Sequence, residues 1–187
     1  MDIGEAAKLA QRSMSRKRFN HTLGVVEWAV ELAQKHGVDE TKAQLAAYLH
    51  DIKKELDYTE QVALARKWGL LNCAEDEENP HLLHGPLAAY WLEHEYGFQD
   101  GEVLAAIAHH TLGRPGMGKL EMLIYSADMT EPHRNFPKVD KLRKALYDNL
   151  EKGTFMCVEH TLEYLRKNKH TIHPQTQLTY EDLQRRL

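Results

Sequence analysis

The sequence lacks the features that mark several common classes of protein. It contains only two cysteines, Cys73 and Cys157, among 187 residues, which is too few for a disulfide framework and lacks the paired spacing of a zinc ribbon. No stretch approaches the ~18 consecutive apolar residues that a membrane-spanning helix needs, and the first residues are too polar for a signal peptide. We therefore expect a cytoplasmic protein with no membrane partner.

The chain also lacks an excess of positive charge. Its 24 Lys and Arg residues against 28 Asp and Glu residues give a formal net charge of -4, which argues against a broadly basic surface for holding nucleic acid. Hydrophobic residues make up 42% of the chain, a globular composition that excludes wholesale disorder. The length predicts a single domain over 1–187. Any polyanionic ligand must then meet a local cluster of cationic side chains.

No segment alternates apolar and polar residues as a half-buried strand would, whereas apolar residues recur at helical spacing almost throughout. The sequence therefore predicts an all-α protein, a helical bundle in which prolines and glycines end the helices. Residues 168–187 are expected to form a short extended tail that straps over the functional site. The predicted helices span residues 4–13, 16–36, 40–52, 59–68, 86–96, 100–111, 118–130, 138–149 and 154–168.

The chain is rich in histidine, with twelve in all, and some of them are expected to face the core. His50 falls on the small apolar stripe of the helix over 40–52, and His110 on that of the helix over 100–111. His109 points to a more exposed side of the same helix. A lone inward histidine is more often a satisfied core residue than a metal ligand, so neither position is decisive by itself.

The joint pattern favours a metal site. Asp128 ends a strongly apolar stripe, and a buried carboxylate without a partner would cost several kcal/mol. His84 is in phase with apolar neighbours, and His21 lies near the start of a largely apolar helix. Inward histidines and carboxylates near helix ends are hard to satisfy pairwise without a cation. The predicted metal ligands are His21, His50, Asp51, His84, His110 and Asp128.

Longer motifs resemble a known family. The adjacent pair His50-Asp51, with His21 upstream and Asp128 downstream, resembles the HD-domain metal-dependent phosphohydrolases, an all-helical superfamily. Together the motifs look like its YqeK-type branch, the symmetrical bis(5'-nucleosyl)-tetraphosphatases of bacteria. The motifs are KRFNHTLGV (17–25), LAAYLHDIKK (45–54), HGPLAAY (84–90), AIAHHTLGRPGM (106–117), LEMLIYSADMTEPHRNFPKVDKLR (120–143) and IHPQT (172–176).

The resemblance implies a substrate, products and a metal. In that family diadenosine tetraphosphate is split into two ADP, and the metal is iron. Carried over by motif position, one group of residues would hold a first metal, and His84 and His110 a second, with Asp51 bridging the two. The first group is His21, His50, Asp51 and Asp128. The resemblance also implies nucleotide contacts by Arg18, Lys54, Arg134, His173 and Thr176.

The requirements of phosphoanhydride hydrolysis explain why metal ligands and cationic side chains would occur together. Two cations about 3.5–4 Å apart can supply both a hydroxide nucleophile and a sink for charge on the leaving oxygen. Mixed imidazole and carboxylate ligands favour iron or manganese over magnesium, and zinc is not excluded. Cationic side chains lie within a few positions of the ligands, and Arg18 and Arg134 are expected to hold phosphate oxygens bidentately. Catalytic roles are assigned to Asp51, Lys54 and Arg134. His84, His110 and Arg114 are also expected to contact the substrate, although a solvated helix end explains Arg114 equally well.

Other readings stay open. The chain can be an HD phosphohydrolase for another nucleotide, such as a deoxynucleoside triphosphate or an alarmone. It can also be a metal- and nucleotide-binding sensor with vestigial activity, although its ligand set is intact. The sequence determines neither the site of attack on the polyphosphate nor a proton donor, and it leaves a homodimer open. Trp28, Trp68 and Trp91 fall on apolar stripes and are better explained as core than as base-stacking residues.

Overall fold

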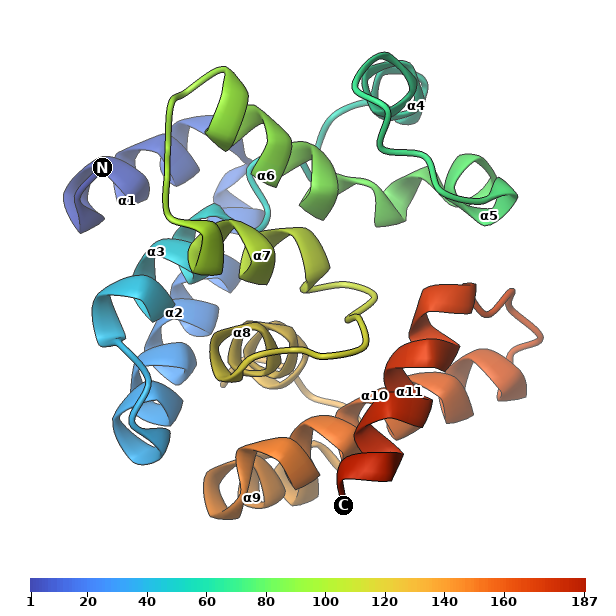
Figure 1. Cartoon of the computed structure of the whole chain (residues 1–187). Coiled ribbons are helices and arrows are strands. Elements are labelled where there is room, and N and C mark those ends of the chain that lie inside the picture. Colours follow the sequence, from blue (N-terminus) through green and yellow to red (C-terminus); the bar gives the residue numbers. More distant parts are fainter.

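The computed structural model describes residues 1–187 and confirms the all-α prediction, because it contains helices and no strand (Figure 1). Its elements are α1 (Ile3–Ser13), α2 (Arg16–His36), α3 (Glu40–Leu49), α4 (Tyr58–Lys67), α5 (Ala74–Glu78), the 3-10 turn η1 (Pro80–Leu82), α6 (His84–His94), α7 (Gly101–His109), α8 (Lys119–Thr130), α9 (Val139–Asp148), α10 (Leu150–Lys167) and α11 (Pro174–Arg186). None of these helices combines the length and the apolar character that crossing a membrane requires.

Helix α8 is the centre of the bundle, and Figure 1 shows it end-on in the middle of the molecule. All residues from Leu120 to Ala127 are buried, as expected for a helix that is enclosed on every side. It packs against α2, α3, α7, α9 and α10. Asp128, in its last turn, therefore lies close to three helices that carry histidines at or near their ends.

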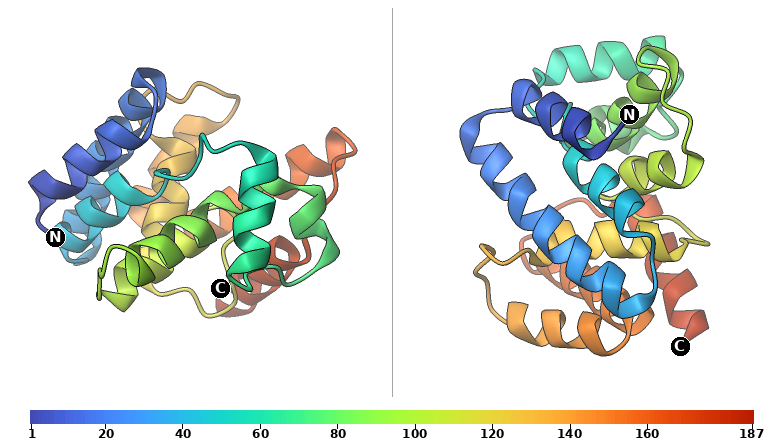
Figure 2. Two further views of the ribbon diagram at one scale, coloured as in Figure 1. Left: turned by 90° about the horizontal axis from the view of Figure 1, so that it is seen from above. Right: turned by 90° about the vertical axis from the view of Figure 1, so that its left-hand side faces the viewer.

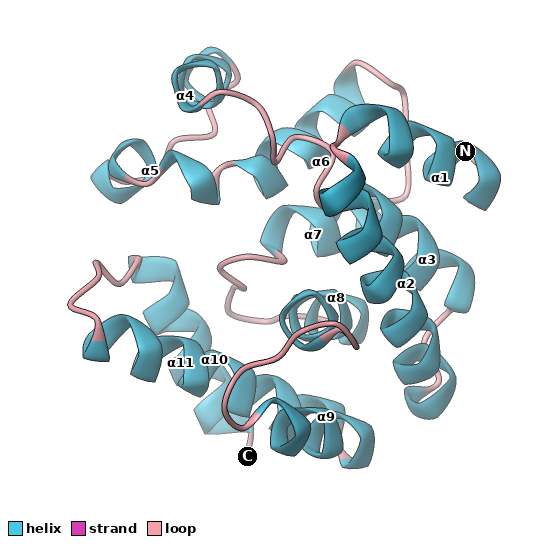
Figure 3. Cartoon of the chain, turned by 180° about the vertical axis from the view of Figure 1, so that it is seen from behind, coloured by secondary structure: helices cyan, strands magenta, loops and turns pink.

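The remaining helices surround this centre. The right-hand view of Figure 2 shows α9 and α10 at the end of the molecule opposite α1 and α4. Figure 3 shows α4 and α5 together at one corner, away from α8. That corner has its own small apolar cluster of Ala65, Leu83 and Leu87, separate from the main core. The corner formed by α4 and α5 is therefore held to the rest of the protein by polar contacts as well as by apolar packing.

The C-terminal prediction was wrong in one respect: residues 174–186 are helical, not extended. Pro174 occupies the first turn, where its missing N–H costs nothing, and the preceding His173 side chain accepts the Gln175 N–H. The buried face of α11 consists of Thr176, Thr179 and Leu183, at positions i, i+3 and i+7. Because threonine supplies most of this stripe, its helical periodicity escapes a search for aliphatic residues.

Two short elements were also missed, and several helix boundaries differ by one to four residues, most at the start of α10. The segment between α4 and α6 contains α5 and η1, which are too short to show an apolar period. Helix α10 begins at Leu150, four residues earlier than expected, because the Asn149 side chain caps it by accepting the Lys152 N–H. Trp28 is buried as predicted, and its indole N–H donates to Thr130 Oγ1 at 3.0 Å.

Candidate metal centre

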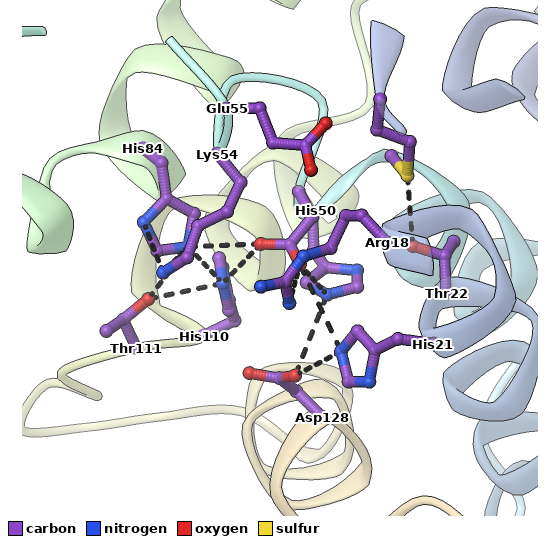
Figure 4. A network of polar contacts seen from close by, with 12 residues as sticks. Arg18, His21, Thr22, His50, Lys54, Glu55, His84, His110, Thr111 and Asp128 are labelled. Atoms are coloured by element: carbon purple, nitrogen blue, oxygen red, sulfur yellow. Dashed lines mark hydrogen bonds and ion pairs between the residues drawn. The ribbon is translucent and has the colours of Figure 1, made fainter. Parts of the chain in front are cut away.

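The six predicted ligands converge on one place. His21 lies in the second turn of α2, His50 and Asp51 follow α3, His84 begins α6, His110 follows α7, and Asp128 lies in the last turn of α8. Figure 4 shows the labelled histidines and Asp128 pointing toward one another from these helices. Overlapping subsets have ligand atoms within 4.8 Å of one another. The convergence arises because each helix contributes a polar residue at the end that faces its neighbours.

Three of the imidazoles are oriented in the same way. Each Nδ1–H donates to the backbone carbonyl three residues earlier, at 2.7 or 2.8 Å. In the neutral form of each ring this hydrogen bond uses the single ring proton, so Nε2 offers its lone pair to a cation in the centre. The three residues are His50, His84 and His110.

The directed lone pairs fit a metal ion. His84 Nε2 and His110 Nε2 face each other at 2.9 Å, and two unprotonated nitrogens at that distance repel unless a cation or a proton lies between them. His50 Nε2 is buried and has no hydrogen-bond partner. A buried polar atom without a partner is costly. A cation shared by these nitrogens removes both problems, so the residues present fit the group that the sequence predicts.

Asp51 lies between the two halves of the centre and is almost fully buried. Its Oδ1 is 3.2 Å from His84 Nε2 and 3.8 Å from His110 Nε2. Its Oδ2 is 3.2 Å from His50 Nε2 and accepts a hydrogen bond from Arg18 Nη1 at 3.0 Å. Each oxygen therefore faces a different set of imidazoles, which is the geometry a bridging carboxylate requires.

Asp128 completes the half that contains His21. His21 Nε2 is 2.8 Å from Asp128 Oδ1, and His50 Nε2 is 3.8 Å from the same oxygen. The Arg134 guanidinium also approaches this oxygen, with Nη2 at 3.3 Å. The Asp128 side chain is 24% exposed, compared with 12% for His21 and 2% or less for the other four residues. The centre is therefore open to solvent on the Asp128 side.

The pKa values of the buried histidines shift in opposite directions. Burial lowers the pKa of His50, but the Asp51 and Asp128 carboxylates outweigh it and raise the pKa to about 9. Burial also lowers the pKa of His110, to about 3, with further lowering by His84 and His50. The centre therefore attracts positive charge most strongly beside the two carboxylates, where a bound metal cation would take the place of the His50 proton.

Sequence reasoning missed Glu131, the residue that orients His21. Glu131 is 3% exposed, and its Oε1 accepts the His21 Nδ1–H at 3.1 Å. Its Oε2 accepts the backbone N–H of His133 at 2.7 Å. Gly24 leaves space for this carboxylate, because a Cβ there would lie 2.5 Å from Oε2. A carboxylate behind a metal-ligating histidine fixes the ring and raises its basicity.

We expect Glu131→Gln to weaken metal binding about 10- to 100-fold, the usual effect of losing such a partner. A competition titration against a metal indicator measures the change. Glu121→Gln is the matched control, because Glu121 is also a buried glutamate but accepts from Arg114 Nε at 2.6 Å instead. Equal metal affinity in Glu131→Gln and the unmodified protein would contradict the orienting role.

Cationic side chains border the centre. Lys54 Nζ lies 3.4 Å from His84 Nδ1, and burial lowers the pKa of Lys54 despite the opposing effect of Asp51 and Asp128. Arg18, His21 and Arg134 line one cavity of about 450 Å³. The other residues that line this cavity are also polar. Arg134 also lines a second cavity of about 270 Å³. That second cavity contains His110, Thr111, Tyr125, Asp128, Met129, Phe136 and Thr161.

Three of the predicted substrate-binding residues lie away from the six converging residues. Arg114 pairs with Glu121 through Nε and Nη2, at 2.6 and 2.8 Å. His173 pairs with Asp76, and Thr176 is buried on α11. None of the three forms a hydrogen bond or an ion pair with the six converging residues. Their contacts with a nucleotide stay predictions.

We expect His109→Ala to leave metal content and activity within about twofold of the unmodified protein, as is usual for substitutions away from a site. His109 is half-buried and its Nδ1 lies 3.1 Å from a Glu121 oxygen, whereas its neighbour His110 faces the centre. Elemental analysis and turnover of His109→Ala, with His110→Ala as the paired variant, check this. Loss of metal from His109→Ala would show that the assignment of these two histidines is reversed.

Comparisons with known proteins find relatives that match this chain over nearly its full length. The chain is 38% identical over 180 residues to the symmetrical bis(5'-nucleosyl)-tetraphosphatase of Bacillus subtilis, covering 96% of each chain. It is 37% identical to the protein of the same name from Halalkalibacterium halodurans, covering 98% of this chain and 97% of that one.

A solved structure extends the similarity to three dimensions. A crystal structure from Clostridium acetobutylicum, described as a predicted HD superfamily hydrolase involved in NAD metabolism, superimposes with a TM-score of 0.94 at 33% identity. The match covers 100% of this chain and 99% of that one. The model of the HD domain family matches residues 18–151, a range that contains all six converging residues. The chain belongs to the HD domain family.

Proposed function

We propose that this protein is a metal-dependent hydrolase that splits diadenosine tetraphosphate symmetrically into two ADP. The observation that carries the proposal is the position of Asp51, whose two oxygens face two different sets of imidazoles. Such a carboxylate suits a pair of divalent cations, which supply a nucleophile at neutral pH and neutralise charge on phosphate oxygens. The names of the relatives that match nearly the full chain support the choice of substrate.

We propose iron as the resident metal, as the family resemblance implies, with manganese or zinc as alternatives. Four imidazoles and two carboxylates offer nitrogen and oxygen but no sulfur. This mixture suits iron, manganese or zinc, whereas magnesium prefers oxygen ligands and retained waters. Metal content measured on protein purified from iron-, manganese- and zinc-supplemented cultures distinguishes the three.

The chain's own side chains fit a long polyphosphate. The wholly polar cavity beside Arg18 and His21 suits phosphate groups, while the smaller cavity has the aromatic and thioether surfaces that a nucleoside can contact. Arg134 lines both. A substrate that spans the two cavities would place its phosphates beside Asp51 and Asp128, and the guanidinium and ammonium groups of Arg18, Lys54 and Arg134 would bind and orient them.

Product analysis tests the proposal. Attack at an inner phosphorus consumes one water and yields two ADP, whereas attack at the phosphorus next to a nucleoside yields ATP and AMP. We expect ADP as the only early product when the iron- or manganese-loaded protein is given diadenosine tetraphosphate and the mixture is separated by chromatography. ATP and AMP in equal amounts would refute symmetrical cleavage.

A substrate panel separates the alternatives. The same loaded protein is assayed with deoxynucleoside triphosphates and with guanosine alarmones. Faster turnover of either would identify an HD phosphohydrolase with another nucleotide substrate. Tight binding of ADP without turnover of any substrate would identify a sensor.

A further inference from the structure

A second group of potential metal ligands lies outside the centre described above, where α5 meets the start of α11. Cys73 precedes α5, Asp76 lies in α5, and His173 is the N-cap of α11. One sulfur, one carboxylate oxygen and one imidazole nitrogen from these residues lie within 4.8 Å of one another. In Figure 1 the two elements lie on the right-hand side, with α5 above the start of α11.

The spacing of the three atoms is close to that of a tetrahedral zinc site. His173 Nε2 lies 3.1 Å from Asp76 Oδ1 and 3.3 Å from Cys73 Sγ. Zinc bonds of about 2.0–2.3 Å in a tetrahedral arrangement place nitrogen about 3.3 Å from oxygen and about 3.6 Å from sulfur. The nitrogen therefore lies within a few tenths of an ångström of its tetrahedral distance from each of the other two atoms, and the sulfur and the oxygen lie within 4.8 Å of each other.

The carboxylate is fixed in place before any ion binds. Asp76 Oδ2 accepts the backbone N–H groups of Asn72 and Cys73, at 2.7 and 3.2 Å, which leaves Oδ1 facing His173. Asp76 and His173 are only 5% and 6% exposed. Burying a carboxylate and an imidazole together beside a partly exposed thiol, away from the main core, is explained more simply by a shared ion than by packing alone.

The charges also balance. A thiolate and a carboxylate neutralise a divalent cation, and the imidazole remains neutral. The ion displaces one proton from the Cys73 sulfur when it binds. A water molecule fills the fourth position of a tetrahedral ion that three protein ligands hold.

We propose that Cys73, Asp76 and His173 form a second metal site, for Zn²⁺ or a similar divalent cation, that ties α5 to α11. The hydrogen bonds and the ion pair among these three residues are the only ones that join α5 and its N-cap to α11 and its N-cap. The corner of the molecule that contains α5 lies outside the main apolar core. The ion therefore cross-links α5 and α11 in a region where few apolar side chains pack together.

Binding also has a consequence for α11. Without the ion, His173 Nδ1 accepts the Gln175 N–H at 3.1 Å, so the ring proton is on Nε2 and donates to Asp76 Oδ1. With the ion on Nε2, the ring proton moves to Nδ1 and this capping bond is lost. The Gln175 side chain donates to Gly113 O, in the loop that follows His110. Filling the site thus adjusts the first turn of α11 and its contact with that loop.

Cobalt spectroscopy tests the site without reference to activity. The six-residue centre contains no sulfur, so a thiolate-to-Co²⁺ charge-transfer band reports only the second site. We expect one equivalent of thiolate-bound Co²⁺ when the full-length protein, its first centre already loaded with manganese, is titrated with Co²⁺. Zn²⁺ should abolish the band by displacement.

Matched variants locate the sulfur and the nitrogen. Cys73→Ser should abolish the band, while Cys157→Ala should retain it, because Cys157 is buried in the main core. His173→Asn keeps a side chain that caps helices well but removes the ligand, and we expect at least about 100-fold weaker Co²⁺ binding, more than the loss of an outer partner causes. Asp76→Asn should weaken binding similarly.

The test of the second site is independent of the test of the proposed function. Asp51→Asn, which changes only the first centre, should leave the band intact. No band at excess Co²⁺ in a protein whose helical circular dichroism is unchanged would overturn the proposal. A band that survives Cys73→Ser, or one that His173→Asn leaves unweakened, would overturn it equally.

Discussion

Asp51→Asn should remove bound metal and lower diadenosine tetraphosphate hydrolysis by at least about 1,000-fold. The carboxylate is the only group in the centre with an oxygen directed toward each set of imidazoles, at 3.2 Å from His50 Nε2 and from His84 Nε2. Asparagine keeps the shape but provides a single, neutral oxygen. Metal-assisted hydrolysis contributes several kcal/mol of transition-state stabilisation, and 1.36 kcal/mol corresponds to each factor of ten.

Elemental analysis and ADP release, measured on the same preparation, check this expectation. Asp57→Asn is the matched control, because Asp57 is an exposed cap of α4 that accepts the Thr59 N–H, and asparagine caps helices equally well. Thermal unfolding of both variants in the presence of a chelator shows whether the fold is intact. Full metal content and activity in Asp51→Asn would overturn the bridging role.

The sequence predicted the six converging residues because each occupies an apolar stripe or follows one. His50 and His110 extend runs of small aliphatic residues, and Asp128 ends the helix that is buried on every side. A polar residue at such a position has only the interior to face. Periodicity therefore identified the residues, although only the packing of α2, α3, α6, α7 and α8 brings them together.

Glu131 shows why the orienting residues were harder to predict. It follows α8 with an extended backbone, outside any helical period, and its role depends on the space that Gly24 leaves on another helix. The signal available in the sequence was a carboxylate three residues after Asp128. The same limitation hid the pair of Arg114 and Glu121, which the packing of a loop against α8 creates.

Arg134→Ala should keep the metal but lower the turnover number about 100- to 1,000-fold, the usual cost of losing a donor that stabilises transition-state charge. The guanidinium is 42% exposed and lies beside the centre, with Nη2 3.3 Å from Asp128 Oδ1. Arg143 holds its backbone by donating to Arg134 O at 2.9 Å. The side chain is thus positioned beside the predicted metal ligands, with its remaining N–H groups available to phosphate oxygens.

Two further variants separate charge from geometry. Arg134→Lys keeps the positive charge but loses the planar pair of donors, so we expect activity between that of Arg134→Ala and the unmodified protein. Arg66→Ala is the control, because Arg66 forms an exposed ion pair with Glu77 and such pairs contribute little. Turnover numbers and metal content are measured together for all three.

The combination of measurements decides what Arg134 does. If it binds phosphate in the transition state, metal content is unchanged and the turnover number falls. If it mainly holds Asp128 in place, metal is lost together with activity, because Asp128 Oδ1 is the oxygen that approaches both His21 and His50. Since the arginine lines both cavities beside the centre, the first result also indicates that the polyphosphate crosses from one cavity to the other at this residue.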